Sequence, residues 1–334
     1  MSVGAGAAGV NPFMGTPPIG PADVKAAAGR IGPRIRPVTM VAADPGPFDR
    51  TSLYLACEST QVTGSFDARG AANFALYHQE HGALPEAGVV VAASGCGNAG
   101  LACAWAARET DSRATVFVPA DCAWQVVGRL HDLGAEVRRA DGDAGQAARA
   151  ATTHAELTGA LLSHAYDNPL IAVGAGTLAA EVNDLVGAEI DTIVLPVGGG
   201  ALLAGTCAAL EHTGIRIVPV EPQRSRTLSM ALEAGFPVDV PAPGLAGDSL
   251  GARRVSQLAL DLARTAGCHQ PVQVTDEEVD RARQTLWEQR RLAVDYGAAT
   301  ALAAIQSGAY VPDVYERVVV VLTGANTDPA TLVR

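Results

Sequence analysis

Short apolar runs alternate with helical patterns in the first half of the chain. The apolar run at 88–93 is followed by a helical pattern and then by another apolar run at 114–119. A strand, a helix and a second strand in this order form a βαβ unit, so the pattern predicts a parallel sheet. The predicted strands of this series are 53–57, 88–93, 114–119 and 136–138, and the predicted helices are 21–36, 100–108 and 124–133.

The same alternation returns in the second half. Thr275 precedes the last helical pattern and Glu278 stands three residues later, which is a capping-box signal for a helix start. Ligands of such sheets bind beyond the carboxyl ends of the strands, so two βα series predict two lobes that flank a crevice. The predicted strands are 192–196, 215–221 and 318–322, and the predicted helices are 176–186, 201–211 and 275–291.

Composition favours small-molecule chemistry. The 334 residues are 48% hydrophobic and 18% charged, with a formal net charge of -11 and no basic stripe. We therefore expect no nucleic-acid and no membrane partner. No signal-peptide pattern stands at the start, and no apolar stretch approaches the roughly 18 residues that span a bilayer. The six cysteines form no CxxC pair, so a cytoplasmic location is expected.

Lysine is nearly absent. Of the 24 basic residues only Lys25 is a lysine, and all the others are arginine. Any mechanism that needs a lysine amine therefore depends on Lys25.

Three consecutive glycines, 198–200, separate the predicted strand 192–196 from the helix that follows. Glycine lets a ligand approach the main chain, and a helix N-terminus directs N–H groups at an anion. The turn therefore predicts a phosphate cup, with a tight turn that binds nothing as the alternative. It has neither the Gly-Lys-Ser/Thr of a Walker loop nor the G-x-G-x-x-G of dinucleotide folds.

Motifs in a fixed order carry a resemblance to a known family. The chain resembles the fold-type II pyridoxal-phosphate enzymes, and the serine/threonine dehydratases (threonine ammonia-lyases) in particular. Its landmarks are Thr63-Gly-Ser-Phe-Asp-Ala-Arg-Gly-Ala71, Cys96-Gly-Asn-Ala-Gly100, His164-Ala-Tyr-Asp-Asn-Pro169, Gly174-Ala-Gly-Thr-Leu178, Val197-Gly-Gly-Gly-Ala201, Val220-Glu-Pro222 and Leu322-Thr-Gly-Ala-Asn326.

The resemblance implies an architecture. It is the α/β fold of the tryptophan synthase β type, in which each lobe is a mainly parallel sheet flanked by helices. Residues 1–87 and 165–334 would form the large cofactor domain, and residues 88–164 the small substrate-loop domain. A homodimer is also implied.

The resemblance also implies roles for single residues. Asn98 would bond the ring hydroxyl of pyridoxal 5′-phosphate, Thr323 would face its pyridine nitrogen, and Phe66 would lie beside the attachment point. The phosphate cup would be Gly198, Gly199, Gly200 and Ala201. The loop for an amino-acid carboxylate would be Ser94, Gly95, Cys96, Gly97 and Ala99.

Two positions depart from the family pattern. The residue after Ser-Phe is the family's Schiff-base lysine, and here it is Asp67, which forms no imine. Any pyridoxal phosphate is therefore expected to bind noncovalently. Relatives that bind a divalent cation use the Glu of the Glu-Pro pair and an acid six residues later. Here Thr227 follows Glu221 at that spacing, so no metal is predicted.

Several residues have two interpretations. Asp67 is either a general base with a pKa raised by burial, a lost catalytic residue, or a partner of Arg69. Cys96 is either a nucleophile activated by a helix N-terminus or, as we favour, a small loop residue. His164 is interpreted as structural and outside the cup, and Trp105 and Trp124 as core residues.

The sequence therefore leads to two functions. The first is a serine/threonine dehydratase-like lyase that acts on a small amino acid or on its pyridoxal-phosphate adduct without the usual lysine. The alternative is a non-catalytic relative that binds pyridoxal phosphate or an amino acid, or regulates an active homologue. A third explanation is an introduced substitution at position 67 of an ordinary dehydratase.

Overall fold

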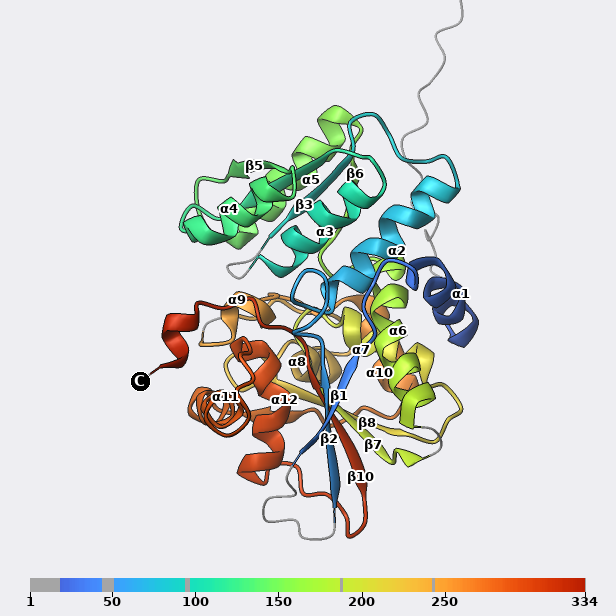
Figure 1. Cartoon of the computed structure of the whole chain (residues 1–334), viewed down its shortest axis with the longest axis vertical. Coiled ribbons are helices and arrows are strands. Elements are labelled where there is room, and N and C mark those ends of the chain that lie inside the picture. The colour runs from blue at the N-terminus through green and yellow to red at the C-terminus, as the bar shows by residue number, and fades with distance from the viewer. Residues whose placement is uncertain (1–18, 44–50, 94–96, 187–188, 242–243, 334) are drawn as a thin grey trace, which may run out of the picture.

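Two separate sheets organise the chain (Figure 1). The computed structural model describes residues 19–43, 51–93, 97–186, 189–241 and 244–333. The first sheet has six strands in the order β1-β2-β10-β7-β8-β9, and only the β1–β2 pair is antiparallel. The second has four parallel strands in the order β5-β4-β3-β6.

The bounds of the strands are as follows. They are β1 Thr39–Ala43, β2 Ser52–Cys57, β3 Val89–Ala92, β4 Ala114–Val118, β5 Glu136–Arg139, β6 Leu161–Leu162, β7 Thr192–Pro196, β8 Arg216–Pro222, β9 Val272–Val274 and β10 Arg317–Leu322.

The helices lie around these sheets. They are α1 Pro21–Ile31, α2 Asp67–Glu80, α3 Asn98–Glu109, α4 Trp124–Asp132, α5 Ala144–Thr158, α6 Pro169–Val186, α7 Ala201–Ala209, α8 Thr227–Ala234, α9 Gly247–Leu250, α10 Gln257–Thr265, α11 Asp276–Arg290 and α12 Tyr296–Ser307, with a 3-10 helix η2 at Pro329–Leu332.

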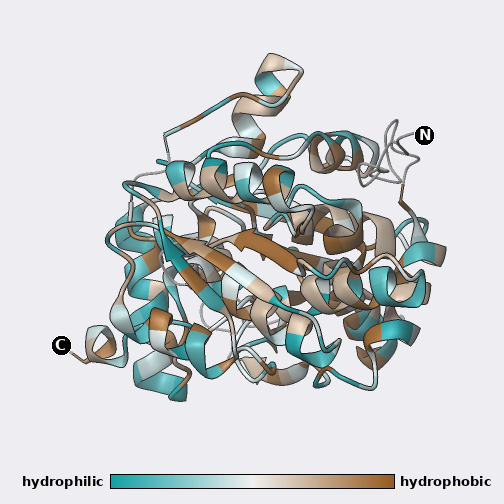
Figure 2. Ribbon diagram, turned by 90° about the horizontal axis from the view of Figure 1, so that it is seen from above, coloured by the Kyte–Doolittle hydropathy of each residue, from teal (hydrophilic) through white to brown (hydrophobic). Residues whose placement is uncertain are grey.

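Both faces of the six-stranded sheet are covered. On β10, Val319 and Val321 pack with α6 and α7, whereas Val318 and Val320 pack with α11 and α12 on the opposite face. A strand that is buried on both faces needs apolar side chains at every position, which explains its unbroken valine run. Figure 2 shows the brown apolar strands in the interior and teal positions on the outer helices.

The predicted elements are present, with ends shifted by up to seven residues, and the predicted α/β fold is confirmed. The helix predicted at 21–36 ends at Ile31, because Pro33 has no N–H to continue the helical hydrogen bonds. The capping box is formed, since Thr275 Oγ1 accepts from the Glu278 N–H and the Glu278 carboxylate accepts from the Thr275 N–H.

Two expectations about apolar residues are wrong: that Trp124 lies in the core, and that no apolar stretch is long enough to span a bilayer. Trp105 is buried as predicted, but Trp124 is 76% exposed, because it is the first residue of α4 and the packed face of that helix carries Leu130. The helix α6 has 18 residues and a mean hydropathy of 1.2, so length and composition would allow it to span a membrane. It is instead a core helix, because 61% of it is buried inside the protein.

Glycines let α6 touch two neighbouring helices at backbone distance. A Cβ added to Gly174 would lie 2.5 Å from the carbonyl oxygen of Arg69 on α2. A Cβ on Gly205 of α7 would lie 2.1 Å from the carbonyl oxygen of Ala172 and 2.4 Å from the nitrogen of Gly176. These contacts leave no room for a methyl group, so the two crossings fix α2 and α7 relative to α6.

We expect Gly205→Ala to destabilise the protein by more than about 2 kcal/mol, because the new methyl group forces the two helices apart. Urea unfolding followed by far-ultraviolet circular dichroism measures this free energy.

The matched control is Gly29→Ala in α1, where no atom lies within 4 Å of the added Cβ. Alanine there should raise stability by up to about 1 kcal/mol, since a helix interior disfavours glycine. Equal effects of the two substitutions would contradict the close-crossing interpretation.

Candidate functional site

The glycine turn presents free N–H groups to the crevice. Its carbonyl groups are used internally: Gly198 O accepts from Thr227 Oγ1 at 2.6 Å, Gly199 O from the Ser256 N–H at 3.0 Å, and Gly200 O from a helix N–H. Within the described part of the chain, the N–H groups of these glycines donate no hydrogen bond. Gly200 is left-handed, with φ +94, and its turn leads directly into α7 at Ala201. The turn therefore has the donors of an anion cup.

A tyrosine forms one wall of this cup. A Cβ added to Gly199 would lie 2.0 to 2.4 Å from ring carbons of Tyr166, so only glycine permits this contact. The neighbouring His164 accepts hydrogen bonds at Nδ1 from the N–H groups of Tyr166 (3.3 Å) and Asp167 (2.9 Å), which leaves its proton on Nε2. His164 therefore has the predicted structural role. It also lines a pocket with Phe66 and Asp67, and the glycines of the cup are not among the lining residues of that pocket.

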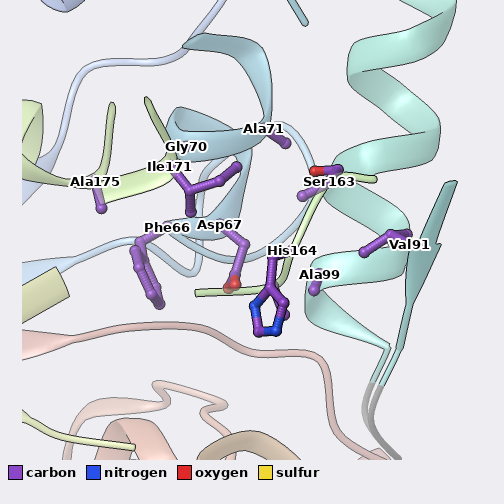
Figure 3. Close-up of a pocket in the computed structure, with 12 residues that line it drawn as sticks. Phe66, Asp67, Gly70, Ala71, Val91, Ala99, Ser163, His164, Ile171 and Ala175 are labelled. Carbon is purple, nitrogen blue, oxygen red and sulfur yellow. The ribbon is translucent and has the colours of Figure 1, made fainter. Parts of the chain in front are cut away.

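That pocket contains several predicted site residues. Phe66 and Asp67 enter it from the start of α2, and Ala99 from the start of α3 (Figure 3). His164 and Ser163 complete the side opposite α2. Sequence reasoning gave Ser163 no role, and no motif distinguishes it from a strand end.

The segment before α2 runs alongside the end of β10. Ser65 forms an antiparallel bridge with Gly324, and the Phe66 N–H donates to the carbonyl oxygen of Thr323 at 2.9 Å. Thr323 is buried at this junction. These contacts place Asp67, at the position of the family's lysine, and Thr323 on adjoining segments.

Asp67 carries an unusual carboxylate. Its Oδ2 atom is excluded from solvent and has no hydrogen-bond partner in the described chain, although the residue as a whole keeps partial exposure. Burial raises the pKa of Asp67 to about 6, the nearby Ser65 hydroxyl opposes this rise, and the charge of Asp295 adds to it. A carboxyl group with this pKa exchanges its proton near neutral pH.

Arg69 does not pair with Asp67, so that alternative is wrong. Its guanidinium makes a bidentate ion pair with Glu58, at 2.8 Å for each bond, and a 2.8 Å ion pair with Glu181 of α6. Its side chain is 1% exposed. One cation with two carboxylates leaves this buried cluster with a net negative charge beside the pocket.

Asn98 lies in a polar bridge between the lobes. Its Oδ1 accepts from Asn326 Nδ2 at 2.6 Å, and Asn326 Oδ1 accepts from Arg129 of α4 at 2.7 Å. Asn326 Nδ2 also donates to Thr63 O. The predicted ring-hydroxyl partner is thus held in place by the loop after β10. Gly97 precedes it as the left-handed N-cap of α3, with φ 76.

Asp295 is a site residue that sequence reasoning missed. It caps α12 by accepting the Ala298 N–H at 2.8 Å, and its own N–H donates to Gly324 O. The Oδ2 atom is buried and has no partner among the described residues. Burial raises its pKa to about 6, while the Ala298 N–H and the Asn98 side chain oppose the rise. The Asp-before-helix pattern signals the cap but not its place beside Thr323.

The Glu221 carboxylate is committed to α8. It accepts hydrogen bonds from the N–H groups of Leu228 (2.6 Å) and Ser229 (3.0 Å) and from the hydroxyl of Ser229, and Thr227 Oγ1 lies 3.2 Å from it. Thr227, which stands at the spacing of the metal-binding acid, links this carboxylate to Gly198 O. These residues therefore support the glycine turn.

Several described site residues that the sequence predicts do not line this pocket, namely Gly97, Asn98, Gly198, Gly199, Gly200, Ala201 and Thr323. Ser94, Gly95 and Cys96 lie outside the described residues, so the predictions for them stay predictions. Lys25 is exposed on α1 and is not among the residues that line the pocket.

Known proteins share this arrangement over nearly the whole chain. The sequence profile described as "Pyridoxal-phosphate dependent enzyme" matches residues 34–324. The chain belongs to this family of pyridoxal-phosphate dependent enzymes. It is similar to the mouse (Mus musculus) protein called serine dehydratase-like, with 34% identity over 77% of each chain.

Two further proteins are similar to this chain. The L-threonine ammonia-lyase of Geobacter sulfurreducens is 33% identical over 84% of this chain and 68% of its own. The solved structure of T.th. threonine deaminase has a TM-score of 0.81 at 28% identity and covers 92% of this chain and 99% of its own.

The residues fit noncovalent binding of the family's cofactor, pyridoxal phosphate. Free N–H groups at Gly198–Gly200 suit its phosphate, and the hydroxyl of Thr323 and the amide of Asn98 suit the polar edge of its ring. They do not fit covalent attachment, because Asp67 rather than an amine enters the pocket.

The raised pKa values predict a pH-dependent stability. The native state keeps protons on Asp67 and Asp295 up to about pH 6, whereas the unfolded chain loses them near pH 3.8. The free energy of unfolding should therefore fall as pH rises between these values. Asp67→Asn should gain about 1–3 kcal/mol relative to wild type between pH 4 and pH 7.5, as measured by urea unfolding of dialysed protein.

Asp184→Asn, at an exposed position of α6, is the control and should show no such change with pH. A variant-to-wild-type difference for Asp67→Asn that stays constant across this range would refute the assignment.

Proposed function

We propose that the protein is a serine/threonine dehydratase-like lyase that acts on a small amino acid or on its pyridoxal-phosphate adduct. In it, Asp67 stands where the family's lysine would be. The observation that carries the proposal is the Asp67 carboxyl group in the pocket beside Phe66 and Ala99. The named relatives, a serine dehydratase-like protein and a threonine ammonia-lyase, support the substrate class.

The cofactor, when bound, withdraws electrons from the α-carbon of an attached amino acid and so makes its α-proton acidic. The N–H groups of Gly198, Gly199 and Gly200 hold the phosphate, and Tyr166 packs against this cup. Thr323 faces the pyridine nitrogen and Asn98 the ring hydroxyl. The loop 94–97 with Ala99 binds the carboxylate of the amino acid. Cys96 is part of this loop.

Asp67 moves the proton in this proposal. A carboxyl group with a pKa of about 6 is largely ionised at pH 7.5 and accepts the α-proton, and it then donates this proton to the departing hydroxyl group. No lysine of this chain lines the pocket, so the amino acid must arrive already joined to the cofactor. The protein is further proposed to act in the cytoplasm as a homodimer.

The alternative function is a non-catalytic binding or regulatory relative. The observation in its favour is the same missing amine, because Lys25 is exposed on α1. Under this alternative the pocket binds its ligand and releases no product.

The deciding experiment supplies pyridoxal phosphate preincubated with L-serine or L-threonine and measures 2-oxo-acid release. Wild type should exceed the rate of the free cofactor, and Asp67→Asn should lose at least about 100-fold of that excess, which is typical of a lost acid–base group. Asp67→Lys should absorb above 400 nm without amino acid and should turn over ordinary substrate. Binding without release by wild type would establish the non-catalytic alternative.

A further inference from the structure

Two buried carboxylates of the site have no cationic partner. Asp67 Oδ2 and Asp295 Oδ2 are both excluded from solvent and accept no hydrogen bond within the described ranges. No ion pair to either residue is formed by the described arginines or by Lys25. A carboxylate without a partner in a buried site is costly, so this arrangement calls for a cation or a proton.

The two carboxylates belong to one site. Gly324 lies between them: Ser65 pairs with Gly324, and a Cβ added there would lie 2.9 Å from Ser65 Cβ and 3.1 Å from Asp295 Oδ2. Asp67 follows Ser65 by two residues, and the charge of Asp295 raises the pKa of Asp67. Figure 3 shows the Asp67 side chain directed into the pocket.

The nearest cations are already engaged. Arg69 is held by Glu58 and Glu181. Arg283 donates to Val294 O, to Thr331 and to Thr327, and stacks 4.2 Å over the ring of Tyr296. Arg129 of α4 donates to Asn326, and the charge of Arg283 lowers the pKa of Asp295. None of the three arginines forms an ion pair with Asp67 among the described residues, so a ligand can supply the positive charge that Asp67 lacks.

We propose that the pocket selects a ligand with a cationic nitrogen beside Asp67. It binds pyridoxamine 5′-phosphate in preference to related phosphates that have no positive charge at C4′. The proposal rests on the proposed function only for the placement of the ligand. With the phosphate on Gly198–Gly200 and the ring between Asn98 and Thr323, Asp67 faces the C4′ carbon. Pyridoxamine phosphate carries an ammonium group there, which makes a charge-assisted hydrogen bond with a carboxylate.

An amino-acid adduct has a protonated nitrogen at the same carbon, so the preference also explains how a site without lysine admits the proposed substrate. The free aldehyde has no such charge and gains nothing from Asp67. The same carboxylate therefore recognises the ligand and stands ready to take its proton.

Isothermal titration tests the preference with two probes that differ only at C4′. These are pyridoxamine 5′-phosphate and 4′-deoxypyridoxine 5′-phosphate, which has a methyl group in place of the aminomethyl group. Full-length dialysed wild type at pH 7.5 should bind the amine at least about tenfold more tightly, as a hydrogen bond between charged groups implies. In Asp67→Asn this ratio should fall at least about fivefold, with the affinity for the deoxy probe changed less than about threefold.

Equal affinity of wild type for the two probes would overturn the proposal, and this measurement needs no variant. A ratio that survives in Asp67→Asn would also overturn it. Because turnover is not measured, a preserved preference without 2-oxo-acid release would refute the lyase and leave the amine site standing. Release of 2-oxo acid without the preference would do the reverse.

Discussion

The close crossing of α6 with α2 and α7 is the constraint on which the site depends. Gly174 meets the backbone of α2, and Gly176 meets Gly205 of α7 two residues later. One helix thus fixes both the start of α2, which carries Asp67, and the start of α7, which carries the glycine turn. At these crossings backbone touches backbone, and no side chain lies between the helices that could change its rotamer. The two halves of the site therefore keep a fixed spacing.

Hydrogen bonds and ion pairs then orient what the crossings position. Arg69 joins α2 to Glu58 after β2 and to Glu181 of α6. Thr227 and Ser256 bind the carbonyl groups of Gly198 and Gly199, and the N–H groups of the turn stay free of partners in the described chain. Because these side chains bind one another and the backbone, the N–H groups of the glycine turn and the Asp67 carboxylate are left without partners in the described chain.

An excess of negative charge distinguishes this site from the family pattern, which has a lysine at the position of Asp67. An amine at position 67 would neutralise part of the charge of Asp295 and Glu58, whereas Asp67 adds to it. The Asp67 carboxylate is stabilised either by a proton or by a cationic nitrogen of a ligand. The first makes the stability of the protein depend on pH, and the second favours a cationic ligand. The two pKa values near 6 and the unpartnered Oδ2 atoms are two expressions of this one electrostatic condition.

The sequence alone determined the elements whose signal is local. The valine run of β10, the Thr275 capping box and the glycine turn each follow from neighbouring residues, and the ordered motifs identified the family. Only the tertiary structure showed that α6 begins at Pro169 rather than at Gly176, because the glycines that weaken a helix are there for contact with other helices. It also decided the partner of Arg69, the exposure of Trp124 and the place of Asp295. Each of these depends on residues distant in the chain, and no local pattern encodes such contacts.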